Sequence, residues 1–191
     1  MKKIFIRLGH DILANGYCTG SDGIVEEYKI VREYGKSLAQ ALEEHFEVKV
    51  FDSTPGTFTT SSEALTAGVT EANNWGADLF ISCHANKYNG KAKGTEVFYY
   101  KGDKTGLILA QHLSKIIANT LGTHNRGAKN GSSLYEIKRT NMTAILLETF
   151  FIDSAYDVAK YQVVTGEVLG KKIAKTLIKN IKKNGGIYYA D

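Results

Sequence analysis

The sequence predicts a single α/β domain built around a mostly parallel β-sheet with helices on both faces. Short runs of β-branched and aromatic residues alternate with longer helical stretches, which is the pattern of strands joined by crossover helices. The chain has 191 residues, enough for one domain with a full core. Its 43% hydrophobic and 23% charged residues, with a single proline, argue against a disordered or fibrous chain.

Five runs bounded by turn residues are expected to be strands: 3–8, 46–52, 78–84, 95–100 and 143–150. Helices are expected at 26–45, 61–75, 105–120 and 154–183. Parallel strands joined in this way are covered on both faces, and their connections are right-handed. The domain is therefore expected to span residues 1–183, and residues 184–191 to be a C-terminal tail or the start of a linker.

Charge, cysteine content and hydropathy exclude several classes of protein. The formal net charge is +4, and the densest lysine group, within 171–183, is interpreted as a solvated helix face rather than an anion-binding surface. Two cysteines cannot form a multi-disulfide scaffold. Arg7 interrupts the first apolar run, so we expect no signal peptide, and no run approaches the roughly 20 apolar residues of a membrane span. We expect cytoplasmic synthesis, and neither nucleic acid nor membrane as a partner.

Three apolar runs each bring a chemically active side chain to the carboxyl end of a predicted strand. KIFIRLGH ends at His10, LFISCH ends at His84, and TAILLE ends at Glu148. Sites in open parallel sheets form beyond the carboxyl ends of the strands, so these three groups are expected to converge. A single histidine is more often a core or loop residue, but two at equivalent positions beside a carboxylate favour a site.

Two imidazoles, a carboxylate and an open position form a common catalytic zinc shell, so a carboxylate ligand is needed. The helix expected at 26–45 offers Glu26 and Glu27. Glu27 shares a helical face with the apolar residues that begin at Val31, whereas Glu26 falls on a more polar line. Glu27 is therefore the candidate ligand, with a simple charge in the first helical turn as the alternative.

Glu148 differs from Glu27 because it lies in the most apolar stretch of the chain. Burial raises the pKa of a carboxyl group, which suits a general acid/base that takes a proton from an attacking water and returns it to the departing amine. A structural glutamate bonded to backbone amides is the alternative. Asn86 and Arg126 are weaker substrate-binding candidates, since an asparagine after a strand is often a turn residue and a loop arginine is often surface charge. Cys83 should face away from His84, into the core.

Six segments in order along the chain resemble the zinc-dependent N-acetylmuramoyl-L-alanine amidases, in particular the catalytic domains of clostridial phage endolysins. They are Gly9–His10, Glu27 at a helix start, SCHAN at 82–86, GTEVFYY at 94–100, NRGAK at 125–129 and LLETFFID at 146–153. The resemblance covers roughly residues 3–183. The chain departs from the common pattern at HDILANGYCTG after the first histidine and at Thr143, where many members have proline. Neither departure removes a ligand, and the first is expected to reshape the substrate cleft.

The resemblance implies a twisted, mostly parallel six-stranded sheet flanked by helices, as in amidases and zinc carboxypeptidases. It implies hydrolysis, by zinc-activated water, of the amide that joins N-acetylmuramic acid to L-alanine of the peptidoglycan stem peptide. His10, Glu27 and His84 would hold one Zn²⁺ per chain, and Glu148 would be the catalytic carboxylate. The partner would be bacterial peptidoglycan, reached after release from the cytoplasm, in a phage lysis enzyme or a mother-cell lysis enzyme. A cell-wall-binding domain beyond Asp191 is compatible with this interpretation.

Two other functions remain open from the residues alone. A zinc carboxypeptidase or endopeptidase acting on the stem peptide would use the same ligands and base, because this chemistry serves any amide. A non-catalytic wall-binding module on a degenerate fold would not need them. The presence of both histidines and both glutamates argues against the second alternative.

Overall fold

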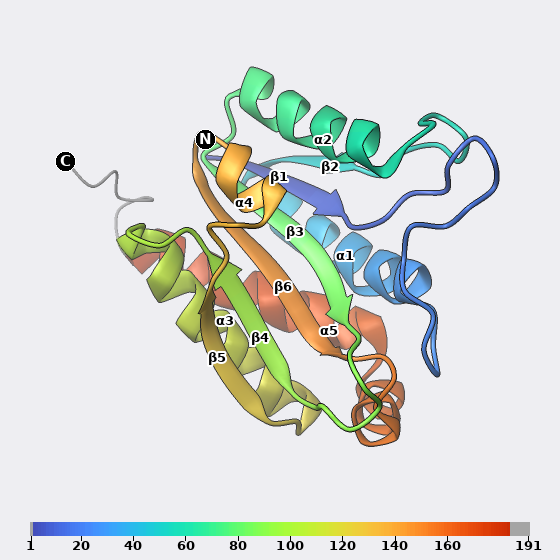
Figure 1. The fold of residues 1–191 in the computed structure, drawn as a ribbon. Helices are drawn as coiled ribbons and strands as arrows, with labels where there is room; N and C mark the ends of the chain where they lie inside the picture. Colours follow the sequence, from blue (N-terminus) through green and yellow to red (C-terminus); the bar gives the residue numbers. More distant parts are fainter. Residues whose placement is uncertain (1, 184–191) are drawn as a thin grey trace.

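The computed structural model describes residues 2–183, in which a six-stranded sheet is sandwiched between two layers of helices (Figure 1). The predicted tail at 184–191 lies outside the described residues. The strands are β1 (Lys3–Leu8), β2 (Glu47–Phe51), β3 (Leu79–Asn86), β4 (Thr95–Tyr99), β5 (Asn125–Asn130) and β6 (Thr143–Phe151). The helices are α1 (Glu27–Glu43), α2 (Ser61–Trp75), α3 (Lys104–Leu121), α4 (Tyr135–Arg139) and α5 (Ala155–Lys183).

The sheet is mostly parallel and has the order β2-β1-β3-β6-β4-β5. β1 pairs in parallel with β2 and β3, and β3 pairs in parallel with β6. β4 is antiparallel to β6 and parallel to β5. The amino ends of β4 and β5 therefore reach the edge of the sheet where β1, β3 and β6 end.

Each face of the sheet buries its own apolar cluster. Helices α1, α3 and α5 cover one face, behind the sheet in Figure 1, and α2 and α4 cover part of the other. The predicted inward stripe of α1 is buried, with Val31, Tyr34, Leu38 and Leu42 all inaccessible to solvent. Cys83 belongs to the same cluster, on the face opposite His84, as the strand alternation predicts.

Two glycines of α5 allow that helix to lie close against α1. A Cβ on Gly170 would come within 2.4 Å of the Tyr34 carbonyl oxygen, and one on Gly166 within 2.6 Å of the Glu33 Cβ. The predicted helix at 154–183 is interrupted immediately before this contact, since Thr165 has φ 69° and ψ 155°. α5 therefore consists of two helical segments, and the second follows α1 closely.

Two elements of the structure are absent from the predicted set. β5 is a half-exposed edge strand, NRGAKN, without the apolar alternation that marks a strand. α4 has five residues, which is too few to show a helical period. Among residues 2–183, no helix combines the length and apolarity that a membrane span requires.

Candidate metal centre and active-site cavity

Three side chains from separate segments converge at the carboxyl edge of β1 and β3. His10 follows β1, Glu27 begins α1, and His84 lies near the end of β3. His10 Nε2 is 2.7 Å from Glu27 Oε1 and 3.0 Å from His84 Nδ1, and His84 Nδ1 is 3.3 Å from Glu27 Oε1. Within residues 2–183, no other group of three or more His, Cys, Asp or Glu side chains gathers its donor atoms in this way.

The backbone beside the two histidines is tightly constrained. Gly9 donates its N–H to the Cys83 carbonyl oxygen at 3.0 Å, and a Cβ on Gly9 would lie 2.5 Å from His84 Cε1. Only glycine fits there, because the chain passes directly against the imidazole ring. His10 has φ 67°, a left-handed conformation that costs energy for a non-glycine residue and is enriched at functional sites. Arg32 secures this turn by donating to the carbonyl oxygens of Gly9 and His10.

Glu27 is buried and fixed by backbone donors on both carboxylate oxygens. Ser21 N–H donates to Oε2 at 3.0 Å, and Ala85 N–H donates to Oε1 at 3.1 Å. Burial alone would raise the pKa of Glu27, but its hydrogen bonds to His10 and His84 outweigh this and hold the pKa well below its usual range. Glu27 is therefore an ionised carboxylate. Glu26, in contrast, is exposed and pairs with Lys29, as a charge in the first helical turn would.

The three donors fit a divalent metal ion in number, chemistry and spacing. Tetrahedral ligands at metal distances of about 2.0–2.1 Å are separated by about 3.3 Å. The separation between His84 and Glu27 already has this value, and the other two, 2.7 and 3.0 Å, need to open by a few tenths of an ångström. Two imidazoles and a carboxylate leave one coordination position for a water or a substrate oxygen. Such a donor set is typical of catalytic rather than closed structural metal sites.

Glu148 faces the same region from β6, where it is opposite His84 in the parallel β3–β6 register. Its Oε2 atom is shielded from solvent and makes no hydrogen bond. Burial, with the negative charges of Glu27, Glu96 and Glu136, raises the pKa of Glu148 to about 8, although His84 acts in the opposite direction. A buried carboxyl group with a free oxygen and a pKa near neutrality is suited to accepting and returning a proton.

A cavity of about 560 Å³ opens beside these groups. Its walls come from the sheet, the loop after β1, and the α2 and α4 side of the fold: Arg7, His10, Asp11, Thr19, Ser61, Leu65, His84, Asn86, Glu96, Phe98, Leu134, Tyr135, Glu136, Leu146 and Glu148. Arg7 lies in β1, and His10, Asp11 and Thr19 lie in the segment between β1 and α1. Ser61 and Leu65 come from α2, and the others from β3, β4, β6 and the region of α4. Its volume lies within the range of ligand-binding pockets.

The weaker substrate-binding candidates are connected through Glu96, which the sequence interpretation missed. Asn86 Nδ2 donates to Glu96 Oε1 at 2.9 Å, and Arg126 Nε donates to Glu96 Oε2 at 2.7 Å. The Arg126 guanidinium also lies 5.1 Å from the centre of the Phe151 ring. Asn86 lines the cavity, whereas Arg126 is partly exposed and does not. Both side chains are therefore held in fixed orientations at or near the cavity.

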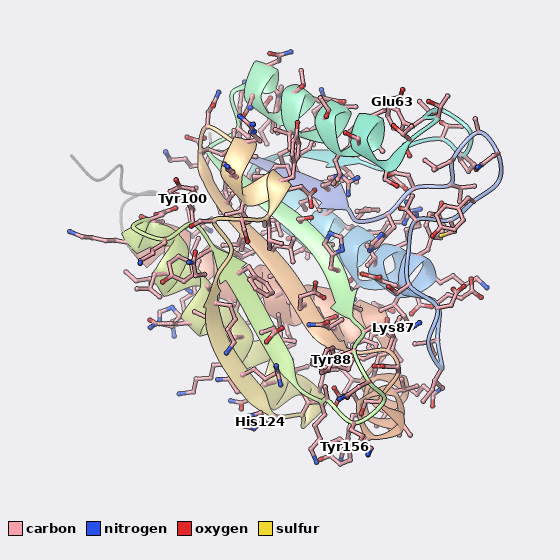
Figure 2. The ribbon with its side chains drawn as sticks, in the orientation of Figure 1. Glu63, Lys87, Tyr88, Tyr100, His124 and Tyr156 are labelled. Carbon is pink, nitrogen blue, oxygen red and sulfur yellow. The ribbon has the colours of Figure 1, made fainter. Side chains whose placement is uncertain are left out.

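The surface beyond the end of β3 is also tied to the loop that carries His10. Lys87 and Tyr88 follow β3 directly (Figure 2), and Lys87 donates to the Asp22 carbonyl oxygen. Tyr88 is 75% exposed. The remaining histidines, for which we expected no role, lie outside the cavity: His45, His112 and His124, the last of them just before β5 (Figure 2).

Comparison with known proteins places these features in a family. The profile described as N-acetylmuramoyl-L-alanine amidase matches residues 4–187. The catalytic domain of the CD27L endolysin, described as targeting Clostridia difficile, is 36% identical and superposes with a TM-score of 0.80, covering 94% of this chain and 98% of that domain. The catalytic domain of CwlV, an amidase from Bacillus (Paenibacillus) polymyxa, is 25% identical with a TM-score of 0.77, covering 98% and 100% of the two chains.

A longer relative shares the same region. An uncharacterised 38.4 kDa protein of Clostridium perfringens is 36% identical over 184 residues, which is 95% of this chain but 52% of the relative. The 191 residues thus span about half of that protein. The family profile covers nearly the whole chain, and the fold agrees with the catalytic domains of the family across its full width. The chain belongs to the N-acetylmuramoyl-L-alanine amidase family.

Proposed function

We propose that the protein is a zinc-dependent N-acetylmuramoyl-L-alanine amidase that hydrolyses the amide between N-acetylmuramic acid and L-alanine of the peptidoglycan stem peptide. The observation that carries this proposal is the convergence of His10, Glu27 and His84 beside the unpartnered carboxyl oxygen of Glu148. The family relationship supports the choice of bond. The donor set supports zinc, which commonly binds two imidazoles and a carboxylate in catalytic sites.

His10, Glu27 and His84 would hold the ion through Nε2, a carboxylate oxygen and Nδ1 respectively. When bound, zinc would polarise the scissile carbonyl and lower the pKa of a water molecule. Glu148 Oε2 would take a proton from the attacking water and return it to the alanine nitrogen as the C–N bond breaks. A nearby cation favours the ionised form of Glu148, so the carboxylate is available as a base although its pKa without metal is raised.

We propose that Asn86 and Arg126 contact the substrate outside the reacting amide. Glu96 holds both side chains, which reduces the conformational entropy they would lose on binding. The guanidinium is suited to a carboxylate of the stem peptide, because it can bind such a group through paired hydrogen bonds. Lysis of bacterial walls, as a phage enzyme or a mother-cell enzyme, is the role that we propose for the activity.

Hydrolysis of purified cell walls tests the proposal. The expected result is the appearance of free alanine amino groups without new reducing sugars, and loss of the reaction when a chelator removes the metal. New reducing ends would indicate glycosidic cleavage and contradict the mechanism. Free amino groups of other residues would indicate an endopeptidase or carboxypeptidase, and wall binding that is unchanged by chelator and without any product would indicate a binding module.

A further inference from the structure

The second ring nitrogen of His84 faces a polar group that the proposed mechanism does not use. His84 Nε2 is 3.0 Å from Ser82 Oγ and 3.5 Å from Glu136 Oε2, and Ser82 Oγ donates to that same Oε2 at 3.0 Å. Because Nδ1 faces the other two metal donors, the proton of the neutral imidazole belongs on Nε2. The short path is therefore a relay in which Nε2–H donates to Ser82 and Ser82 donates to Glu136.

Arg7 anchors the far end of this relay. Its Nε is 3.2 Å from Glu136 Oε1, and its second amino group donates to Asp11 Oδ2 at 2.9 Å. Arg7 is 1% exposed and Glu136 is 4% exposed. Asp11 is itself held by the hydroxyl of Ser53 and directly follows His10. The chain of contacts therefore begins at Asp11, next to His10, and passes through Arg7, Glu136 and Ser82. It ends at His84.

Charges buried to this extent need a reason beyond fold stability. A buried ion pair contributes little net stability, since desolvation offsets much of the attraction. Apolar side chains would fill the same space. A role in core packing alone would not require Ser82 to bridge Glu136 and the imidazole of His84. Glu136 Oε2 accepts a hydrogen bond from Ser82, and Oε1 lies in an ion pair with Arg7 without making a hydrogen bond. Glu136 is thus held beside the imidazole of His84 and is placed to orient it.

We propose that Glu136, acting through Ser82 and held in place by Arg7, is a positioning residue that fixes the tautomer and ring orientation of His84 for metal binding. Hydrogen-bond partners of this kind around a metal-bound histidine are typically worth about 10–100-fold in metal affinity. The inference rests on the proposed function only in requiring that His84 binds the metal. It assigns roles to three residues outside the proposed ligand and base set.

The test measures zinc affinity by competition with a chromophoric chelator in the native protein, Ser82→Ala, Glu136→Gln and the double variant. Each single variant should bind zinc about 10–100-fold more weakly. The double variant should be little weaker than the poorer single variant, because the two residues act in one relay. The absorption spectrum of the cobalt-substituted protein should shift in both single variants. Glu167→Gln, at an exposed glutamate paired only with Lys171, is the matched control and should change neither quantity.

Thermal unfolding of the metal-free proteins separates positioning from a structural role. Lower unfolding temperatures with unchanged zinc affinity and unchanged cobalt spectra would overturn the inference. Ser82→Ala removes no charge, so it decides the question if Glu136→Gln does not fold. A native protein that binds no zinc would instead refute the proposed function.

Discussion

Replacing Glu148 by glutamine removes the proposed proton acceptor with little change of shape. Glu148 Oε2 makes no hydrogen bond, so an amide group at this position disrupts no contact of that atom. Glu148 contributes no donor to the group formed by His10, Glu27 and His84. Glu148→Gln should therefore fold, and should still bind about one zinc ion per chain.

The magnitude of the loss follows from the role of the carboxylate. A positioned general acid/base contributes about 10²–10⁴-fold to the rate, which corresponds to about 3–5 kcal/mol of the activation free energy. The loss should be in kcat, because the side chain acts on the reacting atoms. A carboxylate that merely packed against β3 would give no such loss.

The assay follows wall hydrolysis and zinc content side by side for the native protein, Glu148→Gln and the surface control Glu167→Gln. The control should match the native protein in both. A Glu148→Gln protein that retains zinc and more than about a tenth of the native turnover would refute the assignment of the base.

Four further predictions test other parts of the structure. His84→Ala should lose zinc and wall hydrolysis together, as measured by metal analysis and product release; activity without bound metal would contradict the ligand assignment. Burial raises the pKa of Glu148 from 4.5 to about 8, so the folded metal-free chain binds this proton more tightly than the unfolded chain. The resulting stability is full below pH 4.5 and is lost as pH rises toward 8, with a slope of at most about 1.4 kcal/mol per pH unit and about half of that where cavity water screens the group. Denaturant unfolding of Glu148→Gln should show a shallower decline over this range, and an unchanged slope would refute the assigned shift. Arg126→Met should raise KM about tenfold with kcat nearly unchanged, since the guanidinium would bind the substrate away from the reacting amide; a fall in kcat alone would contradict this role. Leu38→Ala empties a fully buried site between α1 and α5 and should cost about 2–5 kcal/mol in unfolding free energy, whereas an exposed change such as Val163→Ala should cost little.

The sequence predicted the fold well where hydrophobic patterns are strong. Buried strands and the long helices carry clear periods, so their positions agree with the structure to within a few residues. β5 and α4 were missed because an edge strand needs no apolar alternation and a helix of five residues shows no period. The interruption at Thr165 directly precedes the close contact of Gly166 with α1, and no local sequence signal marked it.

The residues of the candidate site also separate into those that a sequence pattern predicted and those that it did not. His10, His84 and Glu148 follow from one rule, that the carboxyl ends of parallel strands share an edge. Glu96 lies outside that rule because β4 runs antiparallel to β6 and reaches the edge with its amino end. Glu136 comes from the short helix α4, on the face of the sheet opposite α1. Arg7 gave one signal, since a charge within an apolar strand has to be paired, but the sequence does not say with what.

Mass spectrometry of the products released from a defined muramyl peptide tests the central claim most directly. Two products are expected: an intact N-acetylmuramic acid with its lactyl carboxyl group free, and a stem peptide that begins with L-alanine. Both should disappear after chelation and return when zinc is restored. Cleavage at any other bond, or undiminished cleavage by the metal-free protein, would contradict the proposed function.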